Sequence, residues 1–163
     1  MGQKQGEASP YSVAVRILGM REHSRSELEQ KLAARGFETV EIEEALDRLV
    51  DQDYLNDSRF AQMVFRQYTD LGRAGVVHQM EKRGLEPGVW ETLVAQIDGS
   101  DEEQRALVAA SKKARELPPD LSDYEQVTRW KRRAFGYLMR RGFTGAAATR
   151  ALAQVLTDAR EFQ

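Results

Sequence analysis

The residues best suited to chemistry in this sequence lie in the stretch YEQVTRWKRRAFGYLMRR, residues 124–141, which has no acid after Glu125. On a helix with about 100° per residue, four arginines fall within one arc of roughly 100°, opposite an apolar face. These four are Arg129, Arg132, Arg133 and Arg140, while Lys131 and Arg141 lie outside the arc. Because guanidinium groups bind phosphates and carboxylates, we predict that the six basic residues form a surface for an anionic partner.

Two alternatives apply to this stretch. The basic residues can be a plain solvated helix face, although mixed charges serve solubility better than a run of one sign. Trp130 and Tyr137 can stack on nucleic-acid bases, but their helical spacing favours a place in the core. We therefore assign the arginines to binding and the aromatic residues to packing.

No residue pattern in the sequence predicts catalysis or a metal site. The two histidines are isolated in the sequence, since His23 lies in the turn before a capping box and His78 has no Asp, Glu or His four positions away on its helix. Asp51 and Asp53 are expected to be solvated carboxylates near a helix end. There is no cysteine, which excludes disulfides and thiolate chemistry. We therefore expect a protein that is not an enzyme and has no cofactor and no bound metal.

Charge is distributed unevenly along the chain. The net charge is −2, which argues against a general nucleic-acid binder. Residues 1–52 carry 7 basic and 10 acidic side chains, and residues 99–163 carry 12 and 9. No window approaches the roughly 18 apolar residues of a membrane span. We expect a cytoplasmic monomer with no membrane partner, whose positive charge gathers in its last third.

Three glycines mark an internal repeat. Gly36, Gly84 and Gly142 each follow a basic residue, and apolar residues recur at fixed distances on both sides of each glycine. Four positions before the glycines stand Leu32, Met80 and Leu138, and ten positions after them stand Leu46, Val94 and Leu152. Such spacing predicts two amphipathic helices joined by a glycine in the left-handed conformation.

A further helix is predicted before each pair, opening at Ser9-Pro10, at Asn56-Asp57 and at the capping box of residues 100–103. Two more capping boxes, at residues 24–27 and 122–125, open the middle helices of the first and last repeats. We predict an all-α fold of three tandem three-helix, helix-turn-helix-like repeats in an elongated, curved array. The predicted parts are a flexible N-terminus, residues 1–9, and repeats at residues 10–52, 53–98 and 99–163, with a stiff hinge at Pro118-Pro119.

Two strings resemble signatures of the bacterial RecX family. Residues 21–32, REHSRSELEQKL, followed by Arg35-Gly36-Phe37, resemble its first-repeat signature, and residues 54–61, YLNDSRFA, are similar to the start of its second repeat. The resemblance implies a modulator that binds the RecA recombinase and the RecA filament on single-stranded DNA. Such proteins limit filament growth and so modulate recombination, DNA repair and the SOS response. One departure, Gly72-Arg73 with Gly75 where the family often has Gly-Pro and then arginine, weakens the middle repeat as a basic contact surface and softens its helix start.

The resemblance leaves the contacts of the basic residues open. They can face an acidic patch of RecA, or single- or double-stranded DNA directly. The alternative function is a stand-alone DNA-binding regulator, because three short helices also suit helix-turn-helix geometry. Against it, the helices after the glycines begin with residues such as Glu38-Thr39 and Glu86-Pro87, which do not read bases.

Overall fold

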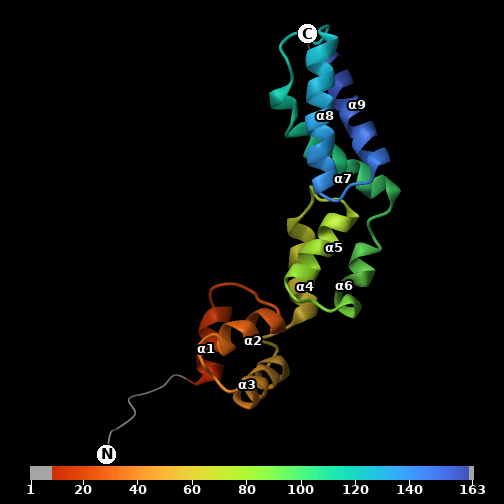
Figure 1. Cartoon of the computed structure of the whole chain (residues 1–163). Helices are drawn as coiled ribbons and strands as arrows, with labels where there is room; N and C mark the ends of the chain where they lie inside the picture. The colour runs from red at the N-terminus through yellow and green to blue at the C-terminus, as the bar shows by residue number, and fades with distance from the viewer. Residues whose placement is uncertain (1–8, 162–163) are drawn as a thin grey trace, which may run out of the picture. The chain divides into compact units, whose positions relative to one another are not determined.

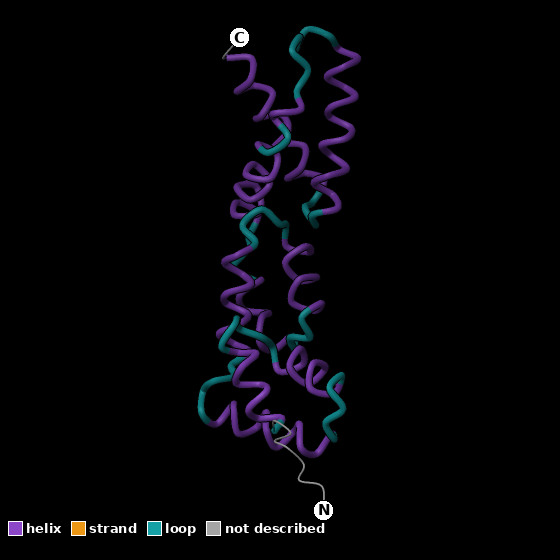
Figure 2. The backbone as a smooth tube through the Cα atoms, turned by 90° about the vertical axis from the view of Figure 1, so that its left-hand side faces the viewer, coloured by secondary structure: helices purple, strands orange, loops and turns teal. Residues whose placement is uncertain are grey.

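The computed structural model describes residues 9–161, and within this range it contains helices and no strand (Figure 2). The predicted all-α fold is therefore confirmed. The α-helices are α1 (Pro10–Leu18), α2 (Arg25–Ala33), α3 (Thr39–Asp51), α4 (Asp57–Gln67), α5 (Arg73–Lys82), α6 (Pro87–Val94), α7 (Gly99–Ser111), α8 (Tyr124–Arg140) and α9 (Gly145–Glu161), with a short 3-10 turn, η1 (Ala114–Glu116), after α7. The predicted flexible N-terminus, residues 1–9, lies outside the described residues except for Ser9.

The three repeat glycines close their helices as predicted. Gly36, Gly84 and Gly142 have φ angles of +83°, +65° and +80°, the left-handed region in which a side chain is strained. After the second and third of these, the next amide reaches back to the helix, from Leu85 to the Met80 carbonyl at 3.2 Å and from Phe143 to the Leu138 carbonyl at 3.4 Å. This bond is typical of a helix ending in a glycine cap.

Three predicted helix starts are confirmed: those of α1 and α2, and that of α4, which begins at Asp57 with Asn56 accepting from the amide of Arg59 at 2.9 Å. Ser9 caps α1 by accepting a hydrogen bond from the amide of Ser12 at 3.2 Å, and Pro10 occupies the first turn. Ser24 caps α2 by accepting from the amide of Glu27 at 3.0 Å. Both hydroxyls satisfy a backbone donor that the helix itself leaves unpaired.

Two predicted caps are wrong by one or two residues. Asp98, not Ser100, caps α7 and accepts from the amide of Asp101 at 2.9 Å. Asp123, not Ser122, caps α8. An aspartate caps a helix as well as a serine does, and its negative charge is further stabilised by the positive end of the helix dipole.

Contacts divide the chain into two compact units. Of the described residues, unit 1 comprises 9–63 and 80–90, and unit 2 comprises 64–79 and 91–161. Each unit therefore takes part of the middle helices α4, α5 and α6. The repeat boundaries at residues 10–52, 53–98 and 99–163, and the elongated, curved arrangement of the repeats, remain predictions.

Unit 1 is organised around α1, α2 and α3, which pack on one another (Figure 1). Its core contains Leu28 and Leu32 of α2 together with Leu46 and Leu49 of α3, all essentially inaccessible to solvent. Leu32 and Leu46 are among the positions that the glycine alignment predicts to be apolar. The amphipathic pattern of the sequence therefore defines the core of the first repeat.

Unit 2 is organised around α7, α8 and α9, with α9 packed against both other helices (Figure 1). Its core combines alanines of α7 with larger residues of α8 and α9, among them Trp130, Leu138 and Leu152. The small side chains of Ala106, Ala109 and Ala110 are fully buried, which allows the α7 backbone to approach its neighbours closely. Pro118 and Pro119 lie in the non-helical connection between η1 and α8; their role as a hinge remains a prediction.

The same type of joint occurs once in each unit. In unit 1 the hydroxyl of Ser24, at the start of α2, donates to the carbonyl of Arg83 in the turn between α5 and α6. In unit 2 the amide of Gly72, at the start of α5, donates to the carbonyl of Arg141 in the turn between α8 and α9 at 3.0 Å. Ser24 and Gly72 occupy the same position when the repeats are aligned on their glycines. In both units, the glycine turn of one repeat thus accepts a hydrogen bond from the start of the second helix of the repeat before it.

Candidate functional site

Helix α8 carries the basic residues singled out from the sequence, and its buried face fixes their orientation. Val127, Trp130, Ala134 and Leu138 face the core. The indole of Trp130 is 1% exposed, and its Nε1 donates to the Lys113 carbonyl at 3.0 Å. The assignment of Trp130 to packing is therefore confirmed, and the opposite side of α8 must face solvent.

The predicted stripe lies on that solvent side. Arg129, Arg132, Arg133 and Arg140 are all exposed, as is Lys131 beside them. Arg129 forms an ion pair with Glu125 at 2.6 Å, in which the two side chains are 64% and 82% exposed. An ion pair this exposed contributes little and yields readily to another anion. We call Arg129, Arg132, Arg133 and Arg140 the arginine stripe.

Most of these cations have no acidic neighbour. Among residues 9–161, no carboxylate forms an ion pair with Lys131, Arg132, Arg133 or Arg140. Gly136 lies at the centre of the stripe, and a Cβ atom there would be 3.3 Å from Nη1 of Arg140. The Arg140 guanidinium thus lies over a position without a side chain.

Arg141 differs from the other five predicted binding residues. Its Nη2 is 2.6 Å from Oδ2 of Asp70, and its Nε donates to the Asp70 backbone carbonyl at 2.9 Å. Its guanidinium also lies 5.3 Å from the ring centre of Tyr137. These contacts tie the end of α8 to the segment before α5. Within unit 2, Arg141 therefore has a structural task, and its role as a binding residue remains a prediction.

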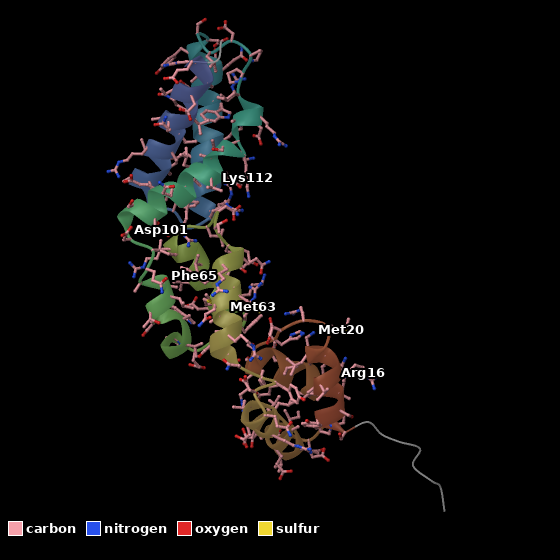
Figure 3. All side chains as sticks on the ribbon, turned by 180° about the vertical axis from the view of Figure 1, so that it is seen from behind. Arg16, Met20, Met63, Phe65, Asp101 and Lys112 are labelled. Carbon is pink, nitrogen blue, oxygen red and sulfur yellow. The ribbon has the colours of Figure 1, made fainter. Side chains whose placement is uncertain are left out.

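A second cation reaches the same carboxylate. Lys112, which follows α7 and is labelled in Figure 3, places its Nζ 2.5 Å from Oδ2 of Asp70. Partial burial by itself raises the pKa of Asp70. The hydrogen bonds from Lys112 and Arg141 outweigh that effect, so the pKa lies below the ordinary value of the carboxyl. Asp70 thus stays ionised and joins three segments of unit 2.

An apolar groove lies beside the stripe, between α8 and α9. Its α8 wall consists of Thr128, Lys131, Arg132 and Phe135, and its α9 wall of Thr149, Leu152 and Ala153. The volume of the groove is about 390 Å³. Phe135 remains 37% exposed although it is a large apolar residue. This groove was not predicted from the sequence, although Thr128, Arg132 and Phe135 are spaced to share one face of a helix.

The histidine of the first repeat is part of a small polar cluster in unit 1. His23 is 3% exposed, and its Nδ1 is 2.8 Å from Oε2 of Glu27, which also pairs with Arg21 at 3.3 Å. Burial lowers the pKa of His23, against the opposing effect of Glu27. The imidazole is thus held neutral inside the turn before α2, where it serves packing rather than binding.

Within residues 9–161, no group of three or more His, Asp or Glu side chains is arranged to hold a metal ion. In the same range, no helix is both long enough and apolar enough to cross a bilayer.

These features describe an all-helical protein of three-helix repeats, joined through glycine turns, whose distinguishing surface is a basic helix face beside an apolar groove. A family model described as RecX, first three-helix domain, matches residues 11–49, which are α1, α2 and most of α3.

Curated relatives extend this match over most of the chain. The chain is 34% identical to the regulatory protein RecX of Xanthomonas citri over 155 residues, which cover 91% of each protein. It is 35% identical to that of Syntrophotalea carbinolica over 137 residues, covering 83% of this chain and 89% of the relative. The regulatory protein RecX of Corynebacterium efficiens is 38% identical over 136 residues, which span 80% of this chain but 63% of that longer relative. The chain therefore belongs to the RecX family of regulatory proteins.

A solved structure supports the fold. The crystal structure of RecX from Lactobacillus salivarius covers 90% of this chain with a TM-score of 0.69 at 21% identity. At that level of identity the likeness concerns the fold alone. It agrees with an all-helical chain built from three-helix domains.

Proposed function

We propose that this protein binds the RecA recombinase and its filament on single-stranded DNA and limits the growth and activity of that filament. Through this activity it modulates recombination, DNA repair and the SOS response. Membership of a family of regulatory proteins supports a regulatory role. The observation that carries the proposal is the arginine stripe, which offers exposed cations on a chain whose net charge is −2.

The stripe is suited to a filament of protein and DNA. From Arg129 to Arg140 it extends over about 16 Å of helix axis, a length that faces a few phosphates or one acidic patch of a protein. The four arginines neutralise at most four phosphates, so the logarithm of affinity should fall with the logarithm of salt concentration with a slope of about −3 on single strands. Affinity then decreases about 50-fold between about 50 and 200 mM salt.

Binding across neighbouring RecA subunits accounts for inhibition. A chain of several repeats touches its target at several weak sites, which act together through effective concentration. A regulator that contacts two subunits at once interferes with the addition of the next subunit. No catalytic step is needed for this effect, and we assign none to the protein.

One comparison tests the proposal. Binding of the labelled protein is measured to RecA-coated single strands, to naked single strands and to naked duplex across a salt series, together with RecA's DNA-dependent ATP hydrolysis. We expect strong preference for the coated strand and a decrease in ATP hydrolysis. Preference for a duplex sequence, with no effect of RecA, would instead indicate the stand-alone DNA-binding regulator.

A further inference from the structure

No segment of unit 2 fills the groove between α8 and α9. The aligned positions of the first repeat show which side chains occupy the corresponding surface there. When the two repeats are aligned on Gly36 and Gly142, Lys131 corresponds to Arg25 and Ala153 to Asp47. In the first repeat, Nη2 of Arg25 lies 2.7 Å from Oδ1 of Asp47. The chain thus supplies its own carboxylate to that cation in the first repeat and an alanine in the last.

Three further positions differ in charge between the two repeats. Where the groove has Thr128, Phe135 and Thr149, the first repeat has Glu22, Glu29 and Glu43. The last repeat therefore has none of the four carboxylates that stand at these positions in the first repeat, and it has kept a cation. Arg132 adds a second cation, because Ser26 stands at its aligned position. The surface that results is apolar at its centre, positive along one edge and without a carboxylate among its lining residues.

We propose that this groove binds an acidic helical segment of a partner protein. Apolar side chains of the segment cover Phe135 and Leu152, and a carboxylate beside them takes the place that Asp47 holds in the first repeat, next to Lys131 and Arg132. This assignment rests on the proposed function, in which the chain binds a protein partner. It specifies the chemistry by which that partner is recognised. The other arginines of the stripe, Arg129, Arg133 and Arg140, do not line the groove and then remain available to DNA.

The spacing of the lining residues favours a helix as the occupant. Thr128, Lys131, Arg132 and Phe135 stand at positions i, i+3, i+4 and i+7 of α8, and the α9 residues stand at i, i+3 and i+4. Two such rows form the kind of groove into which the side-chain ridge of a third helix packs. An amphipathic helix meets both needs of the groove, since its apolar ridge fills the centre and its acidic flank meets the cations.

The other possible occupants fit less well. A nucleic-acid strand needs a continuous track of cations, which the stripe provides, whereas the groove has two cations on one edge. A second copy of this chain would offer the glycine turn of its first repeat, where Gly36 is uncovered. That turn is flanked by Lys31 and Arg35, whose positive charges oppose those of Lys131 and Arg132. Charge complementarity therefore selects an acidic protein segment.

A substitution that restores the carboxylate of the first repeat tests the proposal. In Ala153→Asp, the new side chain is placed to pair with Lys131 as Asp47 pairs with Arg25. The matched control is Gln154→Asp, which introduces the same charge at the next exposed position of α9, outside the groove. Circular dichroism of both variants establishes that the helices are retained.

The probe is a fluorescent, end-capped helical peptide of about 14 residues, or four turns, with leucine at every third or fourth position and glutamate elsewhere. We expect Ala153→Asp to weaken binding of this peptide at least about fivefold, the effect of roughly 1 kcal/mol of charge interaction, and Gln154→Asp to leave it within about twofold. A peptide with glutamine in place of glutamate should bind more weakly to the parent protein.

Three results would overturn the groove assignment: no peptide binding by the parent, equal binding by the two variants, or displacement of the peptide by oligothymidylate, which would indicate nucleic acid in the groove. The same proteins are then tested on RecA-coated single strands. Peptide binding that is sensitive to Ala153→Asp, with no binding to the coated strand, would refute the RecA proposal and leave the groove assignment standing. Binding of the coated strand with no peptide binding would refute only the groove.

Discussion

The amide of Gly72 donates a hydrogen bond to the carbonyl oxygen of Arg141 at 3.0 Å, across 69 positions of the chain. This bond joins the start of α5 to the turn between α8 and α9. A Cβ atom at Gly72 would lie 2.6 Å from Cα of Phe143, and one at Gly142 would lie 2.7 Å from Cα of Gly75. The glycines that weaken α5 as a helix are thus the residues that allow the two backbones to meet.

Gly142→Ala should destabilise unit 2 strongly. The new Cβ adds the strain of a left-handed conformation and also overlaps the backbone of Gly75, so we expect a loss of at least about 3 kcal/mol. Gly36→Ala is the matched control, because Gly36 has the same conformation with nothing within 4 Å of a Cβ. It should cost about 1 kcal/mol. Chemical denaturation followed by circular dichroism measures both, and equal losses would show that the contact at Gly142 contributes nothing.

Asp70→Asn should destabilise unit 2 by roughly 1–3 kcal/mol at neutral pH, because it leaves Arg141 and Lys112 without their shared carboxylate. Glu125→Gln breaks the exposed pair with Arg129 and should cost under about 0.5 kcal/mol.

The pKa of Asp70 is lowered in the folded state. Its stabilisation is therefore fully present above the unfolded pKa near 3.8 and is lost as the pH falls through the lower folded pKa. Denaturation at a series of acidic pH values should show a shallower decrease in the asparagine variant than in the parent.

His23 should make unit 1 less stable in mild acid. Burial lowers the pKa of His23 in the folded state from 6.5. Below about pH 6.5 the unfolded chain therefore binds more protons at this residue than the folded protein does. Stability should therefore decrease as the pH falls below about 6.5. His23→Gln should flatten this part of the profile, with His78→Gln as the control for the loss of one imidazole. A profile unchanged by His23→Gln would assign the acid sensitivity to other groups.

Arg132→Glu combined with Arg133→Glu should weaken binding to the RecA filament or to DNA at least several-fold at physiological salt. Both side chains are exposed and have no carboxylate partner among residues 9–161, so the helical circular dichroism should not change. Arg16→Glu with Lys31→Glu gives the same change in net charge at exposed positions of unit 1. Loss of binding in both double variants alike would point to overall charge rather than to the stripe.

Local patterns of the sequence were sufficient for the helices and the direction of the basic face. Apolar spacing around Gly36, Gly84 and Gly142 predicted two helices at each glycine, because a helix repeats every 3.6 residues and glycine tolerates the left-handed turn. The same periodicity placed Trp130 in the core and Arg132 in solvent. The strings at residues 21–32 and 54–61 also pointed to the family.

The caps were less predictable, because several polar residues near a helix start compete for the same backbone donors. Asp98 and Ser100 both suit a cap, and the sequence does not rank them. In the structure α7 begins at Gly99, and Asp98 is therefore the residue that caps it.

Local residue patterns are enough to predict the helical periodicity, the glycine turns and the gathering of basic residues in the last repeat. Contacts between distant segments decide which of those basic residues are available. Asp70, 71 positions before Arg141, removes that arginine from the exposed group, and α9 brings Ala153 beside the α8 wall that contains Lys131. Such pairings depend on which distant segments meet, and no local pattern of residue types encodes them.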